Sequence, residues 1–181
     1  MIRLMVVALC LLSFGAGAEL LAGAGKVSIV PPFPTHMGGY GDRMEFFEGV
    51  HDEIYARALV IDDGETVVAV VGSGLMSLYD DMADGVRKKV EVATGIPGSN
   101  VMVSCVHNHS APSYYQFESE ADQAKARDFF VDRFSEAVIT AYESRVPAEI
   151  GYGNGELKGV SRNRQQDNEE VIDTQVGVLR F

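Results

Sequence analysis

The sequence has little cysteine and little positive charge, and each scarcity excludes a class of protein. Its 181 residues include two cysteines, Cys10 and Cys105. Cys10 falls in a short apolar leader that we expect to be removed, which leaves Cys105 with no partner for an intramolecular disulfide. Fifteen Lys and Arg residues stand against 26 Asp and Glu residues, and the formal net charge is −11. Phosphate binding needs clustered basic residues, so the sequence disfavours nucleic acid and anionic membrane surfaces as partners.

The sequence also lacks an apolar run long enough to span a bilayer. Residues 4–14 are apolar but fall short of the roughly 20 residues that a spanning helix needs. Arg3 precedes this run and the small residues 16–18 follow it, which is the pattern of an export signal. We therefore predict a signal peptide over residues 1–18, a secreted or periplasmic protein, and no transmembrane segment after signal cleavage. A retained membrane anchor is the alternative.

The apolar pattern predicts a single α/β domain, a mixed-sheet layered domain, over residues 19–181. Runs rich in β-branched and aliphatic residues predict strands, at residues 26–30, 53–61, 66–71, 101–106, 148–157 and 173–181. Apolar residues at helical spacing predict helices over residues 78–93 and 120–144. The last strand-like run continues to Phe181 without a polar tail, so we expect the domain to be incomplete at the C-terminus.

Two histidines stand directly behind the apolar run 101–106. In a strand, residues two apart point to the same side, so His107 and His109 would converge on one spot at its end. Imidazole suits zinc, and the polar loop that follows would leave the metal open to substrate. The alternative is a pair of loop histidines bonded to nearby carbonyl groups or water. The strand in front of the pair favours a metal site.

Several segments occur in the order and approximate spacing of a known family. The two most specific are His-Asn-His-Ser-Ala-Pro at residues 107–112 and Ser-Arg-Asn-Arg at residues 161–164. Shorter segments agree with them, at residues 25–29, 37–40, 49–52, 55–58, 100–104 and 153–157. Together they resemble the N-terminal part of the neutral/alkaline, non-lysosomal ceramidase family. The resemblance covers nearly all of the chain after the leader.

This resemblance implies a zinc hydrolase that cleaves N-acylsphingosine into fatty acid and sphingosine. It assigns His107 as a zinc ligand and His109 and Arg164 as catalytic residues. It also implies that Gly39 and His51 line the substrate pocket. The residue types suit the chemistry, because a permanently charged arginine can hold a developing oxyanion. An imidazole can pass a proton to the leaving amine near neutral pH.

Alternatives remain for two of these residues, and three positions depart from the family pattern. Arg164 could form a structural ion pair with an acid such as Asp167, and His51 could be a loop histidine beside its neighbouring aspartate. The departures are Asn108 for the usual Thr, Ala111 for a Gly, and Ser73 for a frequent Asp. We expect the Asn108 side chain to point away from the face of its two histidine neighbours. The loss of glycine at position 111 matters only if the backbone φ there is positive. With Ser73 in place of an Asp, the site loses an acid that could support the metal ligands.

A catalytic zinc takes three protein ligands, and this sequence offers His107 alone. The resemblance implies that the others lie beyond Phe181, in the C-terminal part of the same domain. The expected partners are that missing part and a lipid-like amide substrate such as ceramide, and the chain alone is expected to hydrolyse nothing. Two alternatives stay open: a zinc hydrolase of another amide or ester, and a non-catalytic binding domain of the same fold.

Overall fold

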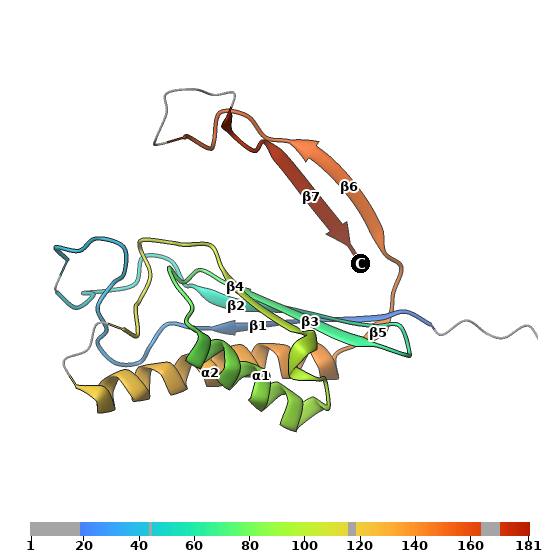
Figure 1. Ribbon diagram of the computed structural model, residues 1–181, viewed down its shortest axis with the longest axis horizontal. Helices are drawn as coiled ribbons and strands as arrows, with labels where there is room; N and C mark the ends of the chain where they lie inside the picture. Colours follow the sequence, from blue (N-terminus) through green and yellow to red (C-terminus); the bar gives the residue numbers. More distant parts are fainter. Residues whose placement is uncertain (1–18, 44, 116–118, 164–170) are drawn as a thin grey trace, which may run out of the picture.

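The computed structural model describes residues 19–43, 45–115, 119–163 and 171–181 (Figure 1). These residues form a five-stranded sheet in the order β4-β3-β2-β1-β5 and a separate two-stranded sheet. No helix in these ranges is long and apolar enough to cross a membrane. The predicted signal peptide, residues 1–18, lies outside the described residues.

The main sheet mixes antiparallel and parallel pairing. Its strands are β1 (Leu21–Ser28), β2 (Tyr55–Asp62), β3 (Val67–Ser73), β4 (Val101–Cys105) and β5 (Val146–Pro147). Antiparallel pairing joins β3 to β2, β2 to β1 and β1 to β5, whereas β3 and β4 pair in parallel. A parallel pair needs a long crossover, which here consists of helix α1 (Asp80–Thr94) and the short 3₁₀ helix η1 (Gly98–Asn100). The predicted mixed-sheet α/β fold is confirmed.

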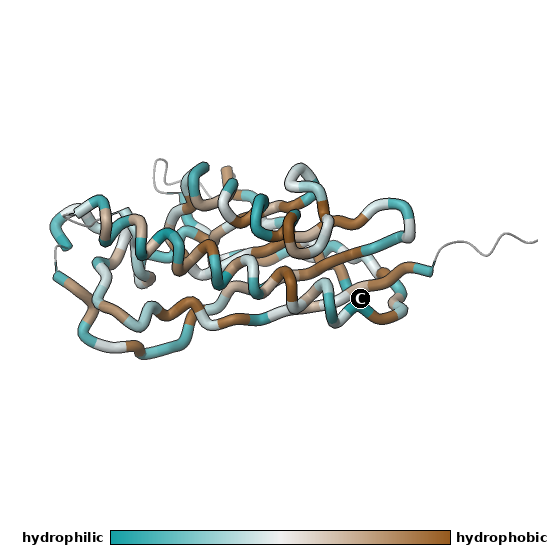
Figure 2. Tube along the Cα trace, turned by 90° about the horizontal axis from the view of Figure 1, so that it is seen from below, coloured by the Kyte–Doolittle hydropathy of each residue, from teal (hydrophilic) through white to brown (hydrophobic). Residues whose placement is uncertain are grey.

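Both helices cover the same face of this sheet (Figure 1). Helix α2 (Glu120–Glu143) packs along β1 and β2, and α1 packs beside α2. Seen from the helix side, hydrophobic and hydrophilic residues alternate along both helices (Figure 2), as expected where one helix face is buried. The largest buried side chains of this core include Met82, Val86, Phe130, Phe134 and Val138.

Helix α2 approaches β1 so closely that two positions of the strand must be glycine. An added Cβ at Gly25 would lie 2.0 Å from the carbonyl oxygen of Ala137, and one at Gly23 would lie 2.0 Å from that of Ala141. These small residues also explain an error in the prediction, which began the first strand at residue 26. Alanine and glycine have weak strand propensity, so the close packing of α2 defines the start of β1 rather than the local sequence.

The other predicted boundaries are closer. Both helices begin and end within two residues of the predicted ranges 78–93 and 120–144. The strand predicted over residues 101–106 ends at Cys105. The predicted C-terminal strands appear as β6 (Gly151–Glu156) and β7 (Gln175–Arg180).

Strands β6 and β7 form an antiparallel hairpin on the side of the main sheet opposite the helices (Figure 1). Every residue of the two strands is exposed. The face of the main sheet turned away from the helices is also open, and it exposes the apolar side chains of Val70 and Met102, by 39% and 59%. The described residues therefore bury only one face of the sheet.

We predict that Gly25→Ala destabilises the protein, because a backbone carbonyl occupies the space of the new methyl group. Overpacking of this kind costs about 2 kcal/mol of unfolding free energy, measured by denaturant titration. Gly153→Ala is the matched control, since it lies in a strand and has nothing within 4 Å of its added Cβ. Equal unfolding free energies for the two variants would contradict the close contact between α2 and β1.

Candidate functional site

The histidine loop, residues 106–113, leaves β4 at the edge of the sheet where β3 also ends. Because the two strands are parallel, their carboxyl ends meet at this edge. The N–H of Val106 donates to the carbonyl of Ser73 over 3.1 Å, and that of Asn108 donates to Leu75 over 3.3 Å. Main-chain hydrogen bonds thus fix the loop against the segment that follows β3.

A hydrogen bond to a carbonyl orients the His107 ring. Its Nδ1 lies 2.9 Å from the carbonyl oxygen of Met76. A carbonyl oxygen only accepts, so Nδ1 carries the proton and the lone pair of Nε2 is left for another partner. The backbone φ of His107 is 59°, a left-handed conformation that is costly for a residue with a Cβ and persists only when its surroundings hold it.

The prediction that the two histidines converge because they share one face of a strand was wrong in its reason. Strand β4 ends at Cys105, and the left-handed backbone at His107 interrupts the alternation of side chains. The rings of His107 and His109 still lie together, with centroids 4.9 Å apart and an interplanar angle of 72°. The conformation of the loop brings them together.

The segment around residues 36–43 holds His109 from the other side. An added Cβ at Gly39 would lie 2.4 Å from Cγ of His109, and the φ of Gly39 is 107°. The ring of Tyr40 stands edge-on to that of His109, 5.1 Å between centroids. Arg43 donates from Nη1 to the carbonyl oxygen of His109 over 2.9 Å. Gly39 therefore makes room for the catalytic candidate His109.

Main-chain bonds join the same segment to the far end of the histidine loop. The N–H of Gly38 donates to Ala111 over 3.1 Å, and that of Ser113 donates to His36 over 2.8 Å. The loop is therefore held between two segments, one after β1 and one after β3. Neither segment is close to the loop in the sequence.

A cavity of about 440 Å³ lies beside the histidine loop. Most of its lining is apolar, from Val30, Pro31, Met37, Phe47, Val50, Ile54, Ala111 and Pro112. The polar lining comes from His51, Asp52, Asn108 and Ser110. An apolar cavity with a few polar groups is the usual form of a small-molecule site.

The two predicted substrate-binding residues, Gly39 and His51, differ in their position relative to the cavity. His51 lines it, and its Nδ1 lies 2.8 Å from Oδ2 of Asp52, with the side chains 97% and 88% exposed. Gly39 is not among the lining residues and contacts His109 instead. The expectation that Asn108 points away from the face of its two histidine neighbours stays a prediction: Asn108 lines the cavity, whereas His107 and His109 are not among its lining residues. Oδ1 of Asn108 accepts from the N–H of Ser110 over 2.9 Å, which fixes the amide.

The two other departures fit their surroundings. Ala111 is buried, and its φ is not among the positive values of the described residues, so this position does not need glycine. Ser73 is buried at the end of β3, and its Oγ accepts from the N–H of Leu75 over 3.2 Å. The serine therefore terminates the strand and offers no carboxylate to the site.

The donor set of the site fits part of a metal centre. Across the described ranges, no group of three or more His, Cys, Asp or Glu residues is placed so that it could hold a metal ion. The second ring nitrogen of His107, Nε2, fits one ligand position of a zinc ion, and the Nδ1 bond to a carbonyl is the support that metal-bound histidines usually have. Arg164 lies outside the described residues.

The sequence analysis assigned no role to three residues of the site. Met76 contributes its main-chain carbonyl, which any residue could supply. Tyr40 and Arg43 contact His109 from a segment more than sixty positions away. Their proximity depends on how the chain between β1 and β2 folds back over the loop.

Comparison with known proteins agrees with this fold. Residues 20–168 match the family described as neutral/alkaline non-lysosomal ceramidase, N-terminal. A crystal structure of neutral ceramidase from Pseudomonas aeruginosa superposes with a TM-score of 0.74 at 26% identity, over 90% of this chain and 29% of that one. A structure described as ceramidase complexed with C2 gives a TM-score of 0.73 at 26% identity, over 90% and 28%. The fold is therefore that of the N-terminal region of ceramidases.

The chain belongs to the neutral/alkaline non-lysosomal ceramidase family. It is 28% identical over 185 residues to neutral ceramidase from Pseudomonas aeruginosa and 25% identical over 140 residues to that from Mycobacterium tuberculosis. These alignments cover 88% and 71% of this chain but 27% and 22% of the relatives. The chain thus spans about a quarter of the length of the curated relatives it matches.

We predict that Gly39→Ala displaces the His109 ring, because the new methyl group would overlap it and the residue would have a positive φ. The measurement is the ¹³C–¹H NMR signal of the His109 ring, which should shift. Gly41→Ala is the control, because an added Cβ there has nothing within 4 Å. An unchanged His109 signal in Gly39→Ala would show that the ring does not depend on Gly39.

Proposed function

We propose that residues 19–181 are the N-terminal part of the catalytic domain of a zinc-dependent amidohydrolase that cleaves ceramide or a similar lipid-like amide. One observation carries the proposal: in a chain of this family, the ring of His107, whose Nδ1 is bonded to the Met76 carbonyl, lies beside that of His109 on a loop that also lines an apolar cavity. Export behind a signal peptide at residues 1–18 belongs to the same proposal, as does a secreted or periplasmic location.

His107 would hold the zinc ion through Nε2. Zinc, when bound, supplies a polarised carbonyl or an activated water. The other ligands would come from the rest of the complete protein. The Met76 carbonyl keeps the proton on Nδ1 of His107, so the neutral ring presents its lone pair without a change of tautomer.

His109 would pass a proton to the leaving amine. Its ring is enclosed by Gly39 and Tyr40, and its main chain is held by Arg43, so that little rotation remains. Arg164 would hold the negative charge that develops on the carbonyl oxygen, since a guanidinium stays charged and offers two parallel donors. The cavity would receive an apolar chain of the substrate, with His51 at its polar part.

A zinc hydrolase with a different amide or ester substrate is the second candidate. Asn108 favours it, because this departure from the family pattern lines the cavity and replaces a hydroxyl with an amide. The direct test is zinc-dependent release of fatty acid by the complete protein, with ceramide and simpler amides and esters compared. Hydrolysis of ceramide supports the first candidate. Hydrolysis of the others alone supports the second, and no hydrolysis favours a non-catalytic binding domain.

We expect His107→Ala to reduce the zinc content of the complete protein strongly, because a three-ligand site that loses one ligand holds its metal weakly. Metal analysis by mass spectrometry after dialysis measures the effect. His36→Ala is the control, because its ring packs against Phe46 at 4.4 Å between centroids and has no assigned ligand role. Undiminished zinc in His107→Ala would refute the ligand assignment.

We expect Arg164→Lys to keep the fold and the zinc while turnover falls by about 100-fold or more, the usual effect of losing a fixed oxyanion donor. Lysine keeps the charge but not the planar pair of donors. The kcat of the complete protein is the measurement, with Arg162→Lys as the neighbouring control. A kcat within a few-fold of the parent protein would favour a structural ion pair for Arg164.

A further inference from the structure

Tyr114 is buried just past the histidine loop and has polar contacts that the proposed chemistry does not use. It is 2% exposed. Its hydroxyl accepts from the N–H of Tyr79 over 3.1 Å and donates to Oδ1 of Asp81 over 3.4 Å. Burial raises the pKa of the Tyr114 phenol, so the hydroxyl remains protonated at any working pH.

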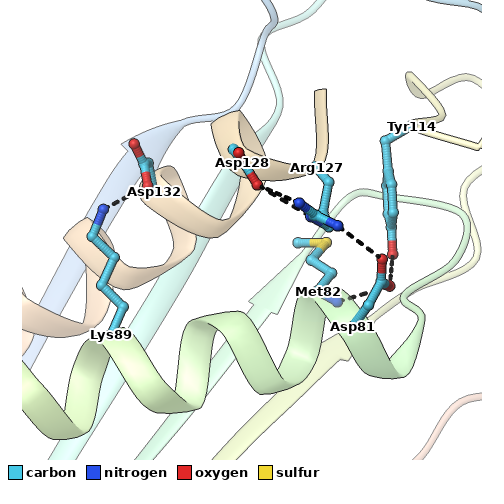
Figure 3. A network of polar contacts seen from close by, with 7 residues as sticks. All are labelled: Asp81, Met82, Lys89, Tyr114, Arg127, Asp128 and Asp132. Atoms are coloured by element: carbon cyan, nitrogen blue, oxygen red, sulfur yellow. Dashed lines mark hydrogen bonds and ion pairs between the residues drawn. The ribbon is translucent and has the colours of Figure 1, made fainter. Parts of the chain in front are cut away.

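Asp81 is tied to both helices. It lies in the first turn of α1, and its Oδ1 also accepts from the N–H of Met82 over 2.9 Å. Arg127 of α2 approaches Oδ2 of Asp81 to 3.8 Å while it also pairs with Asp128. In Figure 3, the Tyr114 hydroxyl and the Arg127 guanidinium both point at Asp81. The ion pair is partly exposed and contributes little by itself, so the buried hydroxyl is the stronger link.

The contacts of Tyr114 form a second link between the end of the histidine loop and the segment after β3; the first link is at His107. The histidine loop is bonded to Ser73, the last residue of β3, and to Leu75 and Met76 in the segment between β3 and α1. The hydrogen bond from the N–H of Tyr79 to the Tyr114 hydroxyl joins the same two segments again, three residues beyond Met76. The Met76 carbonyl therefore lies in a short span that is fixed on both sides.

The left-handed backbone of His107 needs such fixation. A non-glycine residue at φ 59° is retained only where its surroundings overdetermine it. Without the Tyr114 hydroxyl, the part-buried N–H of Tyr79 loses its acceptor, and the segment after β3 loses one of the bonds that tie it to the end of the histidine loop. The span that carries Met76 would then be free to move away from the His107 ring.

We propose that Tyr114 is a positioning residue that acts through Tyr79 and Asp81 to hold the Met76 carbonyl against Nδ1 of His107. The hydroxyl thereby fixes the tautomer that presents Nε2 to a metal. Its value for catalysis rests on the proposed function, but its effect on the His107 ring does not. The ring of Tyr114 also packs against Phe130, so the hydroxyl must be removed without the ring.

Tyr114→Phe is the variant that does this, and Tyr115→Phe is its matched control. Tyr115 is the next residue, stacks on Tyr79 at 3.7 Å between centroids, and is 40% exposed. The first measurement is the ¹⁵N NMR spectrum of the His107 ring in the complete, metal-free protein. We expect Tyr114→Phe to lose a large part of the Nδ1–H tautomer and Tyr115→Phe to keep it.

The second measurement is zinc affinity, by competition with a chelating dye. Loss of a group that orients a metal-bound histidine typically weakens binding by about tenfold or more, and we expect this for Tyr114→Phe alone. If Tyr114→Phe does not fold, Asp81→Ala removes the acceptor of the Tyr114 hydroxyl and should shift the same tautomer signal, with Asp84→Ala on the same helix as control.

The outcomes separate this proposal from the proposed function. An unchanged His107 tautomer in a folded Tyr114→Phe protein, or an equal change in Tyr115→Phe, overturns the positioning role. A tautomer change confined to Tyr114→Phe supports it, even if the parent protein binds no zinc, and in that case the zinc hydrolase fails instead. A tautomer change together with about tenfold weaker zinc binding supports both.

Discussion

The parallel pairing of β3 with β4 is the constraint on which the candidate site depends. Two parallel strands end at the same edge, so the segment after β3 and the histidine loop after β4 lie side by side. That proximity lets the Met76 carbonyl reach His107. It also obliges the chain to cross over between the strands, which is the task of α1. An antiparallel β4 would carry the loop to the opposite edge of the sheet.

The close contact of α2 with β1 fixes the rest of the architecture around that edge. Gly23 and Gly25 let the helix backbone lie directly on the strand, and α1 then packs against α2 on the same face. The helices leave the carboxyl edge of the parallel pair free for loops. They also leave the second face of the sheet open, with Val70 and Met102 exposed among the described residues.

The three departures from the family pattern differ in consequence because their surroundings differ. Ala111 occupies a position without positive φ, and Ser73 uses its hydroxyl to accept a main-chain bond at the end of β3. Both are accommodated by local structure. Asn108 instead lines the cavity, where an amide replaces the hydroxyl usual in the family. The departure that changes the chemistry of the site most, Asn108, is therefore one that lines the cavity.

The sequence by itself predicted the mixed α/β class, both helices, and the histidine pair within a recognisable family pattern, because apolar periodicity and short motifs are local properties. It did not predict where β1 begins, since residues 22–25 are alanine and glycine and the packing of α2 makes them part of a strand. It also misjudged how His107 and His109 meet. The left-handed turn at His107, the Met76 carbonyl and the enclosure of His109 by Gly39 and Arg43 were decided by tertiary structure. Each depends on contacts between segments distant in sequence, and a main-chain carbonyl leaves no trace in residue identity.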